Sequence, residues 1–252
     1  MSYFKSRQTV NVSAIPPPCC LDTKTLHLPR RLFGVLARSH PEAIIIHVNR
    51  IVAALVRRFQ DPDSGMPEAC AETFGTMASH VDLTPAGMEG TTDGETVGDN
   101  IATVFLKPLL DAMNVQTKSV QVAAIMCLER VVLSCREPFD DSLPKLVPRF
   151  TKHLTRSTFL AKGHLVAAIA TLTEVSGDAM GPHLPHLVPL LCDALDSLDW
   201  STRKNTAESL GRLVGCLSAE LLRPFKPAVL PGLDSCRSDR VSTQTVHCKL
   251  LS

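Results

Sequence analysis

The apolar residues of this chain recur at helical spacing, and they do so in paired segments. One stripe follows the i, i+3, i+4, i+7 spacing of an amphipathic helix and consists of Leu184, Leu187, Val188, Leu191 and Leu195. A second stripe follows the polar turn 196–200 and consists of Ala207, Leu210, Leu213 and Val214. Ser201 or Thr202 is available to cap this second helix. The pattern predicts a helical hairpin.

Earlier segments show the same arrangement with less regularity. Residues 51–81 predict a hairpin that turns at Asp61–Gly65, and residues 104–132 predict one that turns at Asn114–Lys118. Residues 146–175 form a third unit, and residues 25–40 match the second helix of a hairpin whose first helix is missing. The expected second-helix stripes are Ala71, Phe74 and Met77 in the first unit, and Leu128, Val131 and Val132 in the next.

Prolines reveal the period of these hairpins. Pro144 and Pro148 recur as Pro185 and Pro189 after 41 residues, and again as Pro227 and Pro231 after a further 42. The segment that begins at Trp200 reappears at Val241, also 41 residues later. A period near 40 residues with two helices per unit is typical of HEAT or armadillo-type repeats. We therefore expect an α-solenoid of about five repeats, the first and last incomplete, cut from a longer array or truncated.

Composition agrees with an all-α fold. Aromatic residues make up only 4% of the chain, while apolar residues make up 44% and are mainly alanine, leucine and valine. We expect a flexible leader at 1–24 and a repeat domain at 25–252. Within this domain, residues 81–100 contain four glycines and five acidic residues without a lysine or arginine, and they predict a mobile loop between repeats.

The sequence contains few groups that point to catalysis. It has no phosphate-binding glycine motif and no metalloprotease motif, and the nearest approach to a metal cluster is His183 and His186 near Cys192. The nine cysteines, without a CxxC spacing, favour free thiols. No apolar run is long enough to span a membrane. We expect a protein that is not an enzyme and has no cofactor, metal, small-molecule substrate or membrane span.

A local surface remains as the candidate site, because the net charge of +1 provides no general attraction to nucleic acid. The segment from Lys145 to His164 carries five basic residues and no acid. Turns within solenoid hairpins stack along one edge, and the basic residues expected there are Lys118, Arg156, Lys162, Arg203, Lys204, Arg237 and Arg240. Such an edge suits an acidic protein surface or a phosphate backbone. Trp200 fits either packing over the turn or an interface anchor.

Four segments resemble a known family. Residues 50–80, 105–132, 157–175 and 193–213 are similar, in order and spacing, to the N-terminal repeat domain of the plant TORTIFOLIA/SPIRAL microtubule-associated proteins. The resemblance implies a TOG-like domain that binds tubulin or microtubules, a place on cortical microtubules in the cytoplasm, and no nucleic-acid partner. The matching segment "DWSTRK" nominates Trp200, Arg203 and Lys204 as tubulin contacts.

The chain also departs from this family. Residues 1–24 do not resemble it, Pro67 and Glu68 stand where a basic residue commonly precedes the acid, and the long basic C-terminal region is absent. Two other functions stay open from the sequence. One is a general scaffold that binds partners through the concave face of the solenoid. The other is an actin-associated function at the nuclear envelope, as in related plant proteins with a similar repeat domain.

Overall fold

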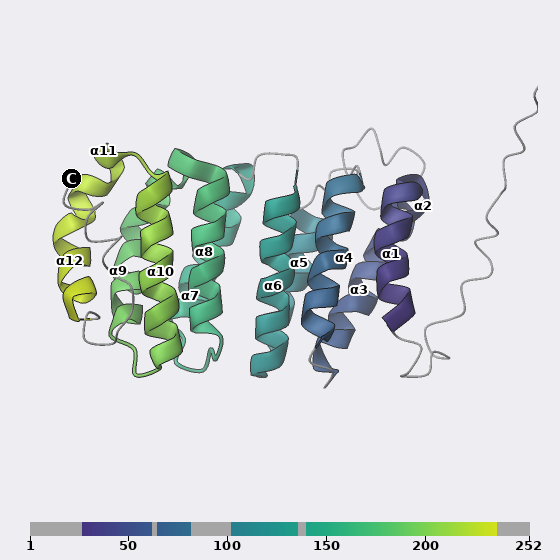
Figure 1. The fold of residues 1–252 in the computed structure, drawn as a ribbon, viewed down its shortest axis with the longest axis horizontal. Helices are drawn as coiled ribbons and strands as arrows, with labels where there is room; N and C mark the ends of the chain where they lie inside the picture. Colours follow the sequence, from purple (N-terminus) through teal and green to yellow (C-terminus); the bar gives the residue numbers. More distant parts are fainter. Residues whose placement is uncertain (1–26, 62–64, 82–101, 136–139, 236–252) are drawn as a thin grey trace, which may run out of the picture.

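The computed structural model describes residues 27–61, 65–81, 102–135 and 140–235, which form two layers of antiparallel helices (Figure 1). One layer contains α1 (His27–Ser39), α4 (Met66–His80), α6 (Lys118–Ser134), α8 (Lys162–Ser176) and α10 (Trp200–Cys216). The other contains α3 (Val48–Arg57), α5 (Lys107–Ala112), α7 (Leu143–Thr155), α9 (Leu184–Leu195) and α12 (Lys226–Ser235). This part of the chain contains no strand, so the all-α solenoid expected from the sequence is confirmed.

Short elements connect the two layers. The helices α2 (Pro41–Ile45) and α11 (Ala219–Leu222) lie between repeats, and a π-helical turn at Ala102–Leu106 leads into α5. The 3-10 turns are Arg58–Gln60, Asp140–Ser142, Gly177–His183 and Arg223–Phe225. Pro144 and Pro185 occupy the first turns of α7 and α9, where a missing amide hydrogen leaves no intrahelical bond unmade.

The hairpins predicted from the period are present as α3–α4, α5–α6, α7–α8 and α9–α10. Each second helix packs beside the next, in the order α4, α6, α8 and α10. The helix α1 packs on α4 in the same layer, which confirms that 25–40 contains a second helix. The leader 1–24, nearly all of the loop 81–100 and the basic residues Arg237 and Arg240 lie outside the described residues.

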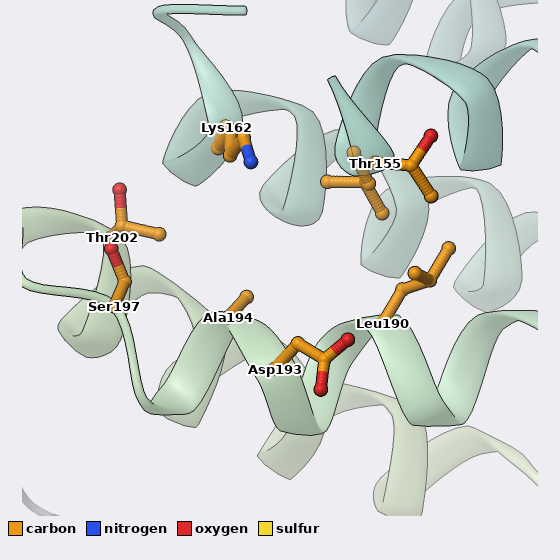
Figure 2. Close-up of a pocket in the computed structure, with 8 residues that line it drawn as sticks. Thr155, Lys162, Leu190, Asp193, Ala194, Ser197 and Thr202 are labelled. Atoms are coloured by element: carbon orange, nitrogen blue, oxygen red, sulfur yellow. The ribbon is translucent and has the colours of Figure 1, made fainter. Parts of the chain in front are cut away.

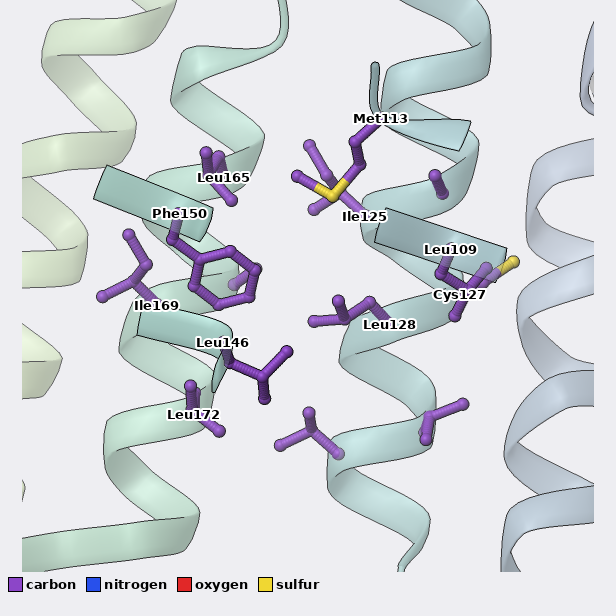
Figure 3. Packing of buried hydrophobic residues seen from close by; sticks show 14 of the residues in the cluster. Leu109, Met113, Ile125, Cys127, Leu128, Leu146, Phe150, Leu165, Ile169 and Leu172 are labelled. Atoms are coloured by element: carbon purple, nitrogen blue, oxygen red, sulfur yellow. The ribbon is translucent and has the colours of Figure 1, made fainter. Parts of the chain in front are cut away.

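Buried side chains fill the space between the layers and between successive hairpins. Every member of the α9 stripe is buried, and so are the stripes of α4 and α6, whereas Val214 of α10 is only partly buried. Figure 3 shows how adjacent hairpins meet: Leu146 and Phe150 of α7 point toward Leu128 of α6. Phe150 is fully buried. Burial of this apolar area is the main stabilising contribution to such a fold.

The N-cap of α10 differs from the prediction. Asp199, and neither Ser201 nor Thr202, caps the helix, because one carboxylate accepts from the backbone N–H groups of Ser201 at 3.3 Å and Thr202 at 3.1 Å. The Thr202 hydroxyl also donates to Asp199 Oδ2 at 2.6 Å. These bonds, the one from the Thr202 side chain first, lower the pKa of Asp199. With Asp199 as its cap, α10 begins at Trp200, one or two residues earlier than Ser201 or Thr202.

A glycine allows α8 and α10 to approach closely at their N-terminal ends. A Cβ atom on Gly163 would lie 3.2 Å from Thr202 Cα and 3.1 Å from Asn205 Nδ2. Because a backbone atom cannot move aside as a side chain can, a larger residue at 163 would push the two helices apart. This contact sets the spacing of the hairpin turns next to these helix ends.

Candidate interaction edge

Three hairpin turns and the helix ends that follow them lie along one edge of the molecule, at the bottom of Figure 1. We call this surface the turn edge and define it as residues 113–117, 156–161 and 196–199 with the N-terminal ends of α6, α8 and α10, which reach Lys204 in α10. Since the N-terminal end of a helix carries a partial positive charge, three helix ends here add to the charge of the basic side chains.

The structure places Lys118, Arg156, Lys162, Arg203 and Lys204 on this edge. Lys118 and Arg156 are exposed, whereas Lys162, Arg203 and Lys204 are partly buried. The sequence grouped these residues by their period alone, and the fold brings them together from three successive repeats.

The Arg203 side chain stabilises its own turn. Its Nη1 donates to the carbonyl oxygen of Ser197 at 2.7 Å and to that of Leu198 at 3.1 Å. Both carbonyl groups lie in the turn after α9, and a guanidinium group has enough donors to bind more than one carbonyl oxygen. Arg203 therefore holds the turn in place. The two carbonyl oxygens partly compensate the positive charge of its guanidinium group.

The exposed Trp200 and the partly buried Lys204 form a pair near the start of α10. Half of the Trp200 surface is exposed, at 51%, and the Lys204 ammonium lies 5.7 Å from the centre of its ring. That distance fits a cation–π contact. Lys204 Nζ also lies 3.8 Å from Glu208 on the exposed face of the helix. The ring is thus held in position while one side stays accessible.

A buried glutamine ties two of the turns together, and sequence reasoning missed it. Gln121 is only 2% exposed, and its Nε2 donates to the Val115 carbonyl at 2.9 Å. Its Oε1 accepts from the Leu160 N–H at 3.0 Å, across 39 residues of chain. Arg156 adds a longer contact to Asn114 Oδ1, at 3.4 Å. The sequence feature that could have indicated this role is a glutamine among positions of α6 that are otherwise apolar and buried.

Each of the three turns also presents an exposed apolar side chain. Val115, Leu160 and Leu198 lie at the tips, and Leu198 is fully exposed, at 101%. Together with Trp200 they give the turn edge apolar contact points between its cations. Sequence reasoning did not identify these tips, because a turn sequence alone does not show whether a leucine folds back onto the core. Exposed apolar groups beside cations are typical of protein interaction surfaces.

A pocket of about 350 Å³ opens between the α7–α8 and α9–α10 hairpins (Figure 2). Lys162 and Thr155 lie on one side, and Asp193 of α9 lies on the other. The hydroxyl groups of Ser197 and Thr202 complete its polar lining. These groups can bind a polar side chain, but they do not form a nucleophile with an adjacent histidine base.

The α7–α8 turn is built over a buried histidine. His153 is 4% exposed, its ring packs 4.8 Å from the Phe159 ring, and its Nδ1 has no hydrogen-bond partner. Burial lowers the pKa of His153, and the positive charges of Arg156, Lys152 and Arg149 lower it further. A neutral imidazole therefore supports the turn that carries Arg156 and Leu160.

The described residues form neither a metal-binding cluster nor a membrane-spanning helix. No group of three potential metal-binding side chains comes together in the described part of the chain, which includes His183, His186 and Cys192. Within those residues, no helix has the length and apolar character needed to cross a membrane. Five of the cysteines are described as free thiols, and Cys70 and Cys127 are fully buried.

Comparison with solved structures supports the fold. The chain matches a designed armadillo repeat protein, solved in complex with the peptide (KR)4, with a TM-score of 0.56 and 15% identity over 93% of this chain and 95% of that one. A second set of computationally designed armadillo repeat proteins matches with a TM-score of 0.50 and 14% identity, over 91% of this chain and 93% of that one. At such low identity the likeness concerns the fold alone.

Comparison with known sequences places the chain in a family. It is 33% identical to the microtubule-associated protein TORTIFOLIA1 of Arabidopsis thaliana over 91% of this chain. It is 31% identical to TORTIFOLIA1-like protein 4 over 84% and 32% identical to TORTIFOLIA1-like protein 5 over 83%, both from the same plant. The chain spans only 25%, 31% and 39% of these relatives. Because the TORTIFOLIA1 N-terminal family model matches residues 29–246, this chain belongs to the TORTIFOLIA1 N-terminal family.

Proposed function

We propose that this chain is a non-enzymatic microtubule-binding protein that contacts tubulin through the turn edge. The relative with 33% identity is named a microtubule-associated protein. The observation that carries the proposal for this chain is the repetition, on three successive turns, of exposed apolar tips beside basic side chains. A partner with an acidic surface and small apolar recesses would match such an edge.

Trp200 and Lys204 are the proposed centre of the contact. A partner that covers the open side of the Trp200 ring would bury aromatic area that is now half exposed, and aromatic residues are often energetic anchors of interfaces. Lys118 and Arg156 extend the positive charge toward the preceding repeats. Arg203 contributes mainly by holding the turn that presents Leu198.

The turn edge is preorganised for this contact. Gln121 fixes the α5–α6 turn against the α7–α8 turn, and Asp199 with Arg203 fixes the α9–α10 turn. A surface that is already ordered loses less conformational entropy on binding. This supports direct docking of the edge rather than coupled folding and binding.

Co-sedimentation of the full chain with stabilised microtubules tests the proposal. We expect the unaltered chain to pellet with microtubules at low salt, and the double variant Trp200→Ala, Lys204→Glu to bind at least about tenfold more weakly. The matched control is Leu32→Ala, Arg38→Glu on α1, which alters one exposed apolar and one exposed basic residue away from the turn edge.

Two results would contradict the proposal. The first is an unaltered chain that stays in the supernatant at low salt. The second is a folded Trp200, Lys204 double variant that pellets as well as the control, which would favour a scaffold function through another surface. Circular dichroism spectra of both variants establish that they remain folded.

The proposed partner also predicts a cytoskeletal location. A fluorescently tagged chain expressed in plant cells should label cortical microtubules, and the Trp200, Lys204 double variant should not. Labelling of the nuclear envelope or of actin filaments would instead favour the alternative relatives considered from the sequence.

A further inference from the structure

We propose that the outer face of α7 is a second binding site, which takes an extended, acidic polypeptide segment. The site consists of Lys145, Arg149 and Lys152, and we call it the α7 stripe. This inference goes beyond the proposed function and does not depend on it, because the stripe lies along α7, in the layer that also contains α5 and α9, rather than on the turn edge.

The three cations lie on one face of α7. Their spacing of i, i+4 and i+7 places them within an arc of about 60° and over a length of about 10 Å, at 1.5 Å per residue. All three are exposed, whereas the buried positions of the same helix include Leu146 and Phe150. The tertiary structure thus divides the basic segment found in the sequence, because Lys162 lies on α8 and lines the pocket.

The positive charge of the stripe is not balanced by ion pairs. Among the described residues, no carboxylate forms an ion pair with Lys145, Arg149 or Lys152, in contrast to the pairs that Arg58 and Arg212 form. Helix energetics explain only part of the stripe: a cation in the last turn, such as Lys152, is favourable, but Lys145 stands in the first turn, where the helix dipole disfavours it. The lowered pKa of His153 agrees with a positive potential here, although burial is its largest cause.

The surroundings favour a narrow polypeptide over a broad polyanion. Asp140 and Asp141 lie before the first turn of α7, and Asp193 lies exposed on the neighbouring helix α9. These carboxylates would repel a duplex or a flat anionic membrane that covered α7 together with α9. Among the described residues, Trp200 is the exposed aromatic side chain, and it lies on the turn edge, so the stripe offers no stacking platform for single-stranded nucleic acid.

An extended acidic segment matches the stripe in spacing. Side chains on one face of an extended chain repeat every two residues, about 6.6 Å apart, and the cations of the stripe follow one another along the helix axis at about 4.5 to 6 Å. Every second residue of a glutamate-rich segment can therefore approach a cation while the others face solvent. The exposed rings of Pro144 and Pro148 lie beside the cations and offer apolar contact to such a segment.

Fluorescence anisotropy with a labelled glutamate-rich peptide of about ten residues tests the inference on the full chain. The stripe variant carries Lys145→Glu, Arg149→Glu and Lys152→Glu, and the control carries Arg38→Glu, Arg50→Glu and Arg223→Glu. All six positions are exposed, and each variant replaces three cations by three glutamates, so both change the net charge equally. We expect the dissociation constant to rise at least about tenfold in the stripe variant and by less than about twofold in the control.

Each other outcome overturns the inference. An equal loss in both variants would indicate attraction by net charge alone, and an unchanged stripe variant would place the peptide elsewhere. Duplex DNA or vesicles with anionic lipids could also bind in a way that depends on the stripe. If either bound more tightly than the peptide, the occupant of the site would not be a polypeptide. The Trp200, Lys204 double variant should bind the peptide normally, so failure of microtubule binding and failure of the stripe are distinguishable. Thermal unfolding of each variant checks the fold.

Discussion

At the scale of single residues, Gln121 shows how a buried polar group shapes a surface. Its amide makes one hydrogen bond to each of two turns, and both bonds reach backbone atoms beside exposed tips, at Val115 and Leu160. A buried amide group that loses its partner costs more than the bond itself contributes. The position of the tips therefore depends on a side chain that no partner touches.

Replacement of Gln121 by leucine should destabilise the chain by about 1–3 kcal/mol, because the Leu160 N–H and the Val115 carbonyl lose their partner. Urea unfolding followed by circular dichroism measures this change. The control is Gln116→Leu, an exposed glutamine in the same turn. Equal unfolding midpoints for the two variants would show that the Gln121 bonds do not stabilise the fold.

His153 should make stability sensitive to mild acid. Its pKa in the folded chain is lowered from an ordinary value near 6.5, so the unfolded chain binds the proton more readily. The stabilising contribution is present above this ordinary value and is lost as the pH falls toward the lower, folded value. His153→Phe should remove part of the loss of melting temperature between neutral and mildly acidic pH.

The control for this measurement is His40→Phe, since His40 is exposed. If the His153 variant lost as much stability on acidification as the control, the buried imidazole would not be the source of the pH dependence. In that case, a pH dependence of microtubule binding over the same range would arise from the groups at the interface and not from His153.

At the scale of elements, a chain of polar contacts joins three helices of one layer, α6, α8 and α10. Arg212 of α10 binds Glu174 of α8 through two contacts of 2.7 and 2.6 Å, and it donates to Thr171 at 2.8 Å. Thr171 in turn donates to Glu129 of α6 at 3.2 Å. The steps of 42 and 41 residues follow the repeat period. The bond from Arg212 lowers the pKa of Glu174, while burial raises that of Glu129.

The contact between α8 and α10 at Gly163 should not tolerate a larger side chain. Gly163→Val places atoms against the Thr202 backbone, and we expect a loss of about 1–3 kcal/mol together with weaker microtubule binding. Thermal unfolding and co-sedimentation measure the two effects. Ser119→Val is the control, because Ser119 occupies the matching second position of α6 and is exposed. Equal stability of the two variants would contradict close packing at Gly163.

At the scale of the whole molecule, the turn edge combines two kinds of attraction that respond differently to salt. Exposed charges are screened over about 8 Å at physiological ionic strength, whereas burial of apolar area is not screened. Lys118→Gln with Lys204→Gln should therefore weaken microtubule binding mainly at low salt. Leu160→Ser with Leu198→Ser should weaken it by about tenfold at low and at physiological salt.

Co-sedimentation over a range of salt concentrations separates these effects. The control is Leu133→Ser with Val175→Ser, which alters exposed apolar residues in the C-terminal halves of α6 and α8, away from the turn edge. A Leu160, Leu198 double variant that binds like this control would restrict the contact to charged groups. The same series on the stripe variant reports whether the α7 stripe also contributes to microtubule binding.

The sequence by itself determined the repeating part of this protein. A period of 41 to 42 residues and the i, i+3, i+4, i+7 stripes were enough to predict the hairpins, the role of α1 as a second helix and a shared edge for Lys118, Arg156 and Trp200. These features follow from local rules, because helical spacing decides which face of each helix is buried and the period decides which turns stack.

Only the tertiary structure decided what each side chain on that edge does. Asp199 caps α10, although the sequence predicted Ser201 or Thr202. Arg203 donates to a carbonyl oxygen of the turn before α10, and Gln121 links two repeats. It also separated the α7 stripe from Lys162. The physical reason is that exposure and hydrogen-bond partners depend on how neighbouring repeats pack. Contacts such as the one between Gln121 and Leu160 join residues 39 positions apart, and no local pattern specifies their geometry.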